Sequence, residues 1–129
     1  MYILYAGSNT EKGYFLENIL YSIDKSKTLL IVKNGYQLLS FLQRVKKGEA
    51  YPELIILEVD MPRLNGQETL ELLKTDDIYR LIPVVVLCSN EEAEIQSYCY
   101  KMGADCMPQP YSNATWMSTV QQLCDRCIN

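Results

Sequence analysis

Two carboxylates follow the most continuously apolar run of the chain. Leu54 to Leu57 are apolar without alternation, and Glu58 and Asp60 come directly after them. This pattern is typical of a strand buried on both faces of a parallel sheet, and ligands of such sheets gather at the carboxyl ends of the strands. Pro62, which fixes φ and lacks an N–H donor, and Asn65-Gly66, which tolerate φ > 0, predict that the strand ends in a turn. The sequence therefore predicts a site at this edge, with Glu58 and Asp60 as its acids.

A second polar group follows the first apolar run, Tyr2 to Tyr5. Gly7, Ser8, Asn9 and Thr10 stand there, and Ser8 precedes Glu11 at the spacing of a capping box. Hydroxyls and backbone N–H groups at a helix N-terminus also hold anions. The loop is similar in this respect to the phosphate-cradling loop of flavodoxins. We favour plain helix capping and keep a small flavin-binding or anion-binding protein as an alternative.

The five cysteines are odd in number and irregular in spacing. We expect mostly buried, reduced thiols, because small hydrophobic packing is the ordinary role of free cysteine in a cytosolic chain. The alternative is zinc or redox chemistry at a C-x-x-C pair, which requires a depressed thiol pKa in the redox case. The cysteines are Cys88, Cys99, Cys106 and the C-x-x-C pair Cys124 and Cys127.

Strand-like runs and helical stripes alternate along the whole chain. Strict alternation predicts an α/β fold with a parallel sheet and helices on both faces. Pro108 places the last strand at a sheet edge, which suits the strand order 2-1-3-4-5. The expected strands are residues 2–5, 28–32, 54–57, 84–87 and 104–107, and the expected helices are 11–22, 36–46, 67–74, 91–102 and one that begins after Ser112 or Asn113.

The size and charge of the chain exclude several classes of function. The chain has 129 residues, a formal net charge of −4 and a pI near 4.8. We expect one domain, no nucleic-acid binding, no membrane span and a cytoplasmic location, because there is no basic surplus, long apolar segment or signal sequence.

The stretch from Leu54 through Met61-Pro62 to Gly66 resembles the third strand and following loop of response-regulator receiver domains, the CheY-like modules of two-component signalling. Pro83 to Leu87, and Gly103 to Asp105 before Pro110, extend the resemblance over essentially the whole chain. It implies a flavodoxin-like, CheY-like (βα)5 three-layer sandwich with a five-stranded parallel sheet. It also implies a single receiver domain over residues 1–129 without an effector domain.

The resemblance breaks at the residues that do the family's chemistry. Glu58 stands at the phospho-acceptor position, which is an aspartate in receivers, and Gly7-Ser8 stand where receivers carry a metal-binding acidic pair. We expect weak or absent Mg²⁺ binding, because the cation needs several oxygen ligands. Asp60 is a second possible acceptor, although a turn-capping role is the simpler interpretation.

Two further positions differ from the family pattern. Cys88, followed by Ser89, replaces the hydroxyl residue that ends the fourth strand, and Gln109 replaces the lysine that precedes the proline after the fifth. Phosphoryl transfer depends on neutralising charge, so these losses predict a module that is not an enzyme and holds no cofactor. Glu58 is either an imitation of phosphoaspartate or, as we prefer, an ordinary strand-end carboxylate. A conventional phospho-accepting switch remains the alternative.

Ten tyrosines against two phenylalanines suggest an interaction surface. Tyr98, Tyr100 and Tyr111 lie in or near the fourth helix, fifth strand and fifth helix, the face that receivers use for dimers and output partners. Tyrosine joins an apolar body to a polar tip and suits interfaces, but core packing explains these residues equally well. The expected partner is a histidine kinase, a phosphotransfer protein or a downstream signalling protein, with a homodimer through this face as a further possibility.

Overall fold

The computed structural model describes residues 2–88, 93–109 and 112–126. Ser89, Tyr111 and Cys127, which the sequence analysis singled out, lie outside these ranges. Strands and helices alternate as expected. The elements are β1 (Tyr2–Ala6), α1 (Thr10–Ile23), β2 (Thr28–Val32), α2 (Gly35–Gln43), β3 (Leu54–Glu58), α3 (Gly66–Thr75), the 3₁₀ helix η1 (Tyr79–Leu81), β4 (Val84–Cys88), α4 (Ala93–Lys101), β5 (Asp105–Pro108) and α5 (Asn113–Asp125).

The five strands form one parallel sheet in the order β2-β1-β3-β4-β5. The predicted strand order is therefore confirmed, with β5 at one edge. β3 lies in the middle, and all five of its residues are buried. Because the strands are parallel, their carboxyl ends meet at one edge of the sheet. β1 ends there at Ala6, β3 at Glu58, β4 at Cys88 and β5 at Pro108, which is followed by Gln109.

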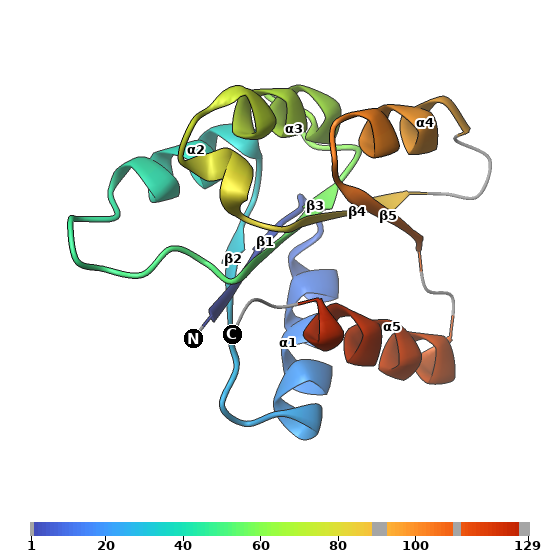
Figure 1. Ribbon diagram of the computed structural model, residues 1–129. Helices are drawn as coiled ribbons and strands as arrows, with labels where there is room; N and C mark the ends of the chain where they lie inside the picture. The colour runs from blue at the N-terminus through green and yellow to red at the C-terminus, as the bar shows by residue number, and fades with distance from the viewer. Residues whose placement is uncertain (1, 89–92, 110–111, 127–129) are drawn as a thin grey trace.

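Helices cover both faces of the sheet, which gives the predicted three-layer sandwich. Helices α1 and α5 lie on one face and α2, α3 and α4 on the other (Figure 1). Alternate strand residues divide between two cores, with Ile56 and Leu87 facing α1 and α5, and Leu57 and Val86 facing the other helices. Trp116 is buried in the first core.

Helix α1 begins differently from the predicted capping box. Asn9, not Ser8, is the N-cap, and its side chain accepts a hydrogen bond from the Lys12 N–H at 3.1 Å. Ser8 is exposed, and the helix starts at Thr10. Both residue types are good N-caps, so spacing alone left the start uncertain by one residue. The predicted second helix was also too long, because α2 ends at Gln43.

Gly66 is needed for close packing rather than for a positive φ. An added Cβ at Gly66 would lie within 3.0 Å of the Val59 Cα and still closer to the Glu58 carbonyl oxygen. The residue with positive φ in this turn is Arg63. Asn65 caps α3 in a capping box with Glu68. The turn predicted after the acidic cluster is therefore present, and it holds the end of β3 against the start of α3.

No helix among the described residues is both long and apolar enough to cross a lipid bilayer.

Candidate functional site

A cavity of about 290 Å³ lies at the carboxyl edge of the sheet. Its lining comes from the ends of β1, β3, β4 and β5 and from the first turn of α1. It contains five of the residues that the sequence analysis expected at the site: Ser8, Glu58, Asp60, Cys88 and Gln109. The fold therefore brings residues that are far apart in the sequence to one place.

Glu58 is the centre of this cavity and is 8% exposed. Its Oε1 accepts a hydrogen bond from the Tyr5 hydroxyl at 2.8 Å and lies 3.0 Å from the Lys12 Nζ. Its Oε2 accepts a hydrogen bond from the Gln109 side-chain amide. Both carboxylate oxygens are therefore bonded to side chains of the same chain.

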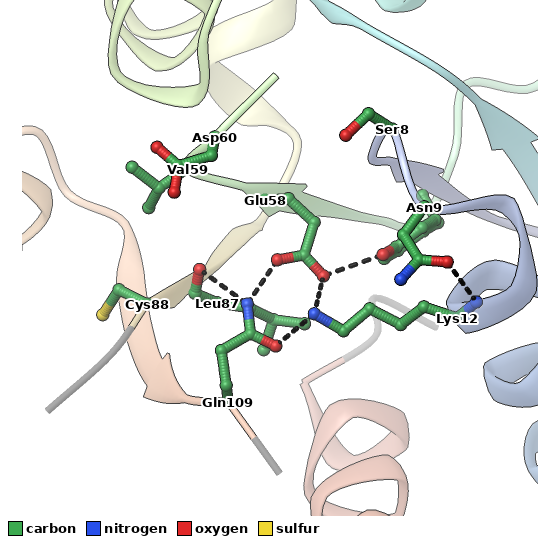
Figure 2. Close-up of a pocket in the computed structure, with 10 residues that line it drawn as sticks. Ser8, Asn9, Lys12, Glu58, Val59, Asp60, Leu87, Cys88 and Gln109 are labelled. Atoms are coloured by element: carbon green, nitrogen blue, oxygen red, sulfur yellow. Dashed lines mark hydrogen bonds and ion pairs between the residues drawn. The ribbon is translucent and has the colours of Figure 1, made fainter. Parts of the chain in front are cut away.

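Lys12 and Gln109 also bind each other. The Lys12 Nζ donates a hydrogen bond to the Gln109 Oε1 at 2.6 Å, which closes a ring of contacts with Glu58. Figure 2 shows the three side chains pointing toward one another. The Gln109 Nε2 also approaches the Leu87 carbonyl at 3.3 Å, and the Gln109 N–H donates to the Cys88 carbonyl at 3.0 Å. The ring is thus anchored to the end of β4.

Lys12 was missed by the sequence analysis. It lies in the first turn of α1, where side chains lean toward the helix N-terminus and therefore toward the strand ends. Its ammonium stands beside the only carboxylate of the ring, where it neutralises a charge that is largely removed from water. The position of a lysine three residues after an N-cap was the available sequence signal.

Tyr5 was also missed, because a tyrosine in an apolar strand is most simply read as core. It is fully buried, and its hydroxyl reaches Glu58 from beneath the cavity. Burial, the negative charge of Glu58 and the hydrogen bond to Glu58 raise the pKa of Tyr5 far above its usual range. The phenol is therefore a permanent hydrogen-bond donor to the carboxylate.

Gly7 leaves the space that this arrangement requires. An added Cβ at Gly7 would lie 2.7 Å from the Tyr5 hydroxyl oxygen and 2.8 Å from the Glu58 Cγ. Contacts this short do not occur between packed atoms, so a larger residue would displace Tyr5 or Glu58. The position where the family resemblance expects an acid is thus filled from two sides by other residues.

Asp60 and Ser8 lie at the rim of the cavity, and both residues are exposed. The Asp60 carboxylate takes no part in the interactions drawn in Figure 2. Among the described residues, no group of three or more His, Cys, Asp or Glu side chains is arranged to hold a metal ion.

The structure corrects the expectation that the thiols are reduced. Cys88 and Cys106 form a disulfide between β4 and β5, with their Cα atoms 6.8 Å apart. The pair was not predicted, because it depends on the register of two strands that the sequence alone does not give. Cys99 is free and buried, as expected for a small hydrophobic residue.

The C-x-x-C alternative is not supported at Cys124. This thiol is free and half-buried in α5. Burial, the largest influence, raises its pKa, whereas the redox alternative required a depressed value.

The two described tyrosines of the predicted interaction face differ in their environment. Tyr98 packs against the core of α2, α3 and α4, and its hydroxyl donates a hydrogen bond to Glu71 at 3.4 Å. Tyr100 is 87% exposed. Exposed apolar side chains also occur on α3 and η1, at Leu72 and Leu81.

Comparison with known proteins identifies the family. Residues 14–120 match the model of the response regulator receiver domain, which is most of the chain. The response regulator Rcp1 of Synechocystis is 30% identical over 100 residues, which cover 74% of this chain and 68% of that protein. The chain therefore belongs to the response regulator receiver domain family. As a receiver domain, it is a component of two-component signalling.

Other relatives are longer and combine the matching region with further sequence. A protein-glutamate methylesterase/protein-glutamine glutaminase of Treponema denticola is 34% identical over 99 residues, but the match covers only 25% of that protein. Protein PilG of Pseudomonas aeruginosa is 30% identical over 79 residues, which cover 58% of it. What these whole proteins do does not carry over to a chain that spans only part of them.

Solved structures agree with the fold. The phosphorylated cyanobacterial phytochrome response regulator RcpA superposes with a TM-score of 0.81 at 21% identity, covering 94% of this chain and 89% of that chain. The chemotaxis response regulator CheY4 of Vibrio cholerae gives a TM-score of 0.75 at 20% identity, covering 95% and 97%. At these identities the likeness establishes the CheY-like fold.

Proposed function

We propose that this receiver domain acts in two-component signalling as a phosphorylation-independent protein-interaction module and not as an enzyme. Residues 1–129 act as one receiver unit in the cytoplasm. The observation that supports this is the engagement of Glu58, whose two carboxylate oxygens are bonded to Tyr5, Lys12 and Gln109.

A phosphoryl acceptor needs a free carboxylate oxygen to attack phosphorus and cations to neutralise the charge that develops. In this site the nucleophilic oxygens already accept hydrogen bonds. The Lys12 ammonium is used to neutralise Glu58 itself and is 3.0 Å from it. Phosphorylation of Glu58 would have to break these contacts before the reaction begins.

The donor set does not fit a divalent cation. Mg²⁺ binds through several oxygen ligands in octahedral geometry. Here Glu58 is the one buried carboxylate of the cavity, Gly7 and Ser8 supply no carboxylate, and the Asp60 carboxylate is exposed at the rim. We therefore propose that the ammonium of Lys12 takes over the neutralising role of a metal ion, and that Mg²⁺ binding is weak or absent.

The contact between Glu58 and Gln109 has a consequence for the shape of the module. It joins the end of β3 to the residue that follows β5, and it exists without a phosphoryl group. We propose that this contact holds the strand ends in one arrangement permanently. A surface that does not change with phosphorylation suits a constitutive docking module.

The proposed partner is a protein of the same signalling pathway, namely a histidine kinase, a phosphotransfer protein or a downstream signalling protein. Tyr100 on α4 is the best candidate contact because its large ring is almost fully exposed. A second copy of the chain is the alternative occupant of the α4, β5 and α5 face. Sedimentation of the purified chain, with no partner protein present, would separate the two: only the homodimer predicts a dimer for the wild-type chain and a monomer for Tyr100→Ala.

The test of phosphorylation is intact mass before and after incubation with magnesium and a small-molecule phosphodonor. We expect no mass gain for the wild-type chain under conditions that fully label a conventional receiver. Glu58→Gln and Asp60→Asn are the matched variants, because each removes one possible acceptor and keeps the side-chain size.

A hydroxylamine-sensitive gain of one phosphoryl group would overturn the proposal. Loss of that gain in Glu58→Gln would identify Glu58 as the acceptor, and loss in Asp60→Asn would identify Asp60. Either result would establish the alternative, a conventional phospho-accepting switch.

A further inference from the structure

The disulfide lies at the same end of the sheet as the Glu58 site. Cys88 is the last residue of β4, and Cys106 is the second residue of β5. In the register of these strands Cys106 stands opposite Val86, two residues before Cys88, so the two cysteines are diagonal neighbours. Residues two apart in a strand point to the same face, and both side chains therefore lie on the α3 and α4 side.

These two cysteines differ from the other described ones. Cys99 and Cys124 are free thiols whose pKa values are raised by burial, which makes them weak nucleophiles. Cys88 is 1% exposed but lines the cavity, whereas Cys106 is half-buried. Within the described part of the chain, one bonded pair therefore stands apart from two inert thiols, and Cys106 is its more accessible sulfur.

The pair is also connected to the carboxylate site. The Cys88 carbonyl accepts the Gln109 N–H at 3.0 Å, and Gln109 follows Cys106 on the same chain segment. The side chain of Gln109 in turn donates to Glu58. The end of β4 is thus joined to β5 by the disulfide at Cys106, and to the residue that follows β5 by the hydrogen bond from Gln109.

We propose that Cys88 and Cys106 form a reversible thiol–disulfide exchange site for low-molecular-weight thiols and disulfides of the glutathione type. In the oxidising direction the Cys106 thiolate attacks one sulfur of the oxidised disulfide and releases one thiol. The Cys88 thiolate then attacks the Cys106 sulfur of the mixed disulfide and releases the second. Two protein thiols and one small disulfide thus become one protein disulfide and two small thiols.

Such an exchange site would let the domain respond to the redox state of its surroundings. Paired cysteines in a reducing compartment are commonly transient and serve redox sensing. Oxidation would tie the end of β4 covalently to β5, three residues before Gln109, and reduction would leave only hydrogen bonds between the two strands. The input would be the redox state of the cell, and no phosphoryl group is involved.

The experiment equilibrates the native chain in glutathione buffers of graded reduced-to-oxidised ratio, quenches with acid and alkylates the free thiols. Mass spectrometry of the intact chain and of its peptides then counts the modified cysteines. We expect Cys88 and Cys106 to lose alkylation together in one reversible transition, while Cys99 and Cys124 do not change. Alkylation of Cys88 and Cys106 at every ratio would overturn the proposal, and so would a disulfide that excess dithiol does not reduce in the folded chain.

Two serine variants sharpen the result. Cys106→Ser should abolish the transition, and Cys99→Ser, another cysteine of the same face, should leave it unchanged. A transition that survives in Cys106→Ser or disappears in Cys99→Ser would assign the exchange to a different pair. The wild-type alkylation pattern does not depend on whether either variant folds.

The connection to the carboxylate site is tested by amide NMR of the wild-type chain in both redox states. The backbone and side-chain amide signals of Gln109 should shift on reduction, while those of Gln37 in α2 should not. Unchanged Gln109 signals would show that exchange is not transmitted to Glu58. Neither measurement uses a phosphodonor. A negative result here would therefore overturn the exchange site without affecting the proposal of a phosphorylation-independent function.

Discussion

The Lys12 Nζ lies 3.0 Å from the Glu58 Oε1, although the two residues come from α1 and β3, which are separated in the sequence by β2 and α2. The adjacency of β1 and β3 in the sheet makes this possible, because α1 starts just after the end of β1. An internal ion pair therefore stands at the position where receiver chemistry is expected.

Replacing Lys12 by Met should destabilise the fold by about 2 kcal/mol. This value lies between the small effect of an exposed ion pair and the larger cost of leaving a buried charge without its partner. Urea denaturation at neutral pH measures it. Lys47→Met, at an exposed loop position, is the control and should change stability by less than about 0.5 kcal/mol. Equal stability of Lys12→Met and the wild-type chain would contradict a structural role for the pair.

Tyr5→Phe should change how stability depends on pH. Because the folded-state pKa of Tyr5 is raised, folding favours the protonated phenol, and that stability is lost as the pH rises above the unfolded value of about 10. The wild-type chain should lose up to about 1.4 kcal/mol per pH unit more than Tyr5→Phe above that pH.

Near neutral pH, Tyr5→Phe should cost about 1 to 2 kcal/mol through the lost hydrogen bond to Glu58. Denaturant midpoints between about pH 9 and 11 test the difference in slope. Tyr14→Phe, at an exposed position of α1, should follow the wild-type curve. Parallel curves for Tyr5→Phe and the wild-type chain would rule out the buried phenol as the cause.

Gly7→Ala should destabilise the chain by about 1 to 3 kcal/mol, because the new methyl group would overlap Tyr5 and Glu58. Thermal denaturation would measure the loss, and Ser8→Ala, one residue further on at an exposed position, should be nearly neutral. If Gly7→Ala is as stable as the wild-type chain, the close approach at this position is not a constraint on folding.

Reducing the disulfide should lower stability by about 3 kcal/mol in the chain-entropy model, because the two cysteines are 18 residues apart in the sequence. The measurement compares denaturant midpoints with and without a dithiol. A Cys88→Ser, Cys106→Ser double variant should show no effect of the dithiol, and a reductant effect of the same size in that variant would point to another pair.

Lys27→Met should be among the most disruptive single substitutions of a charged residue. Lys27 and Glu53 form a buried ion pair with 2.8 Å between Nζ and Oε1, and removing one partner leaves a buried charge, at a cost of about 3 to 5 kcal/mol. Arg126→Met, which breaks the exposed pair with Asp105, should cost less than about 1 kcal/mol. Similar losses for both variants would mean that burial of the Lys27 pair does not set its energy.

The strand order and the place of Glu58 at the end of β3 were predicted from local patterns combined with the resemblance to a known fold. The apolar run of β3 marks a central strand, and Pro108 marks an edge. The partners of Glu58 were not predicted, since they depend on where α1 and β1 lie in space. From the sequence alone, Tyr5 is most simply interpreted as a core residue and Lys12 as a residue of the helix surface. Their contact with Glu58 becomes evident only when the ends of β1 and β3 lie side by side.

The disulfide was not predicted for the same reason, because it depends on how distant segments are placed in space. Cys88 and Cys106 become neighbours only when β4 and β5 are aligned in register, and an odd number of cysteines gives no pairing. Cys88 itself was placed correctly at the end of the fourth strand from local pattern and resemblance. What was missing was the diagonal contact across the sheet.

The cation of this site is part of the polypeptide. A dissolved ion occupies its site according to its concentration and can be removed by dilution or by a chelator. The ammonium of Lys12 is attached to α1 by covalent bonds, so its local concentration at Glu58 is fixed by the fold. If the site binds no divalent cation, as we propose, the charge balance at this end of the sheet should not depend on the supply of such ions, and unwinding of the first turn of α1 should change it.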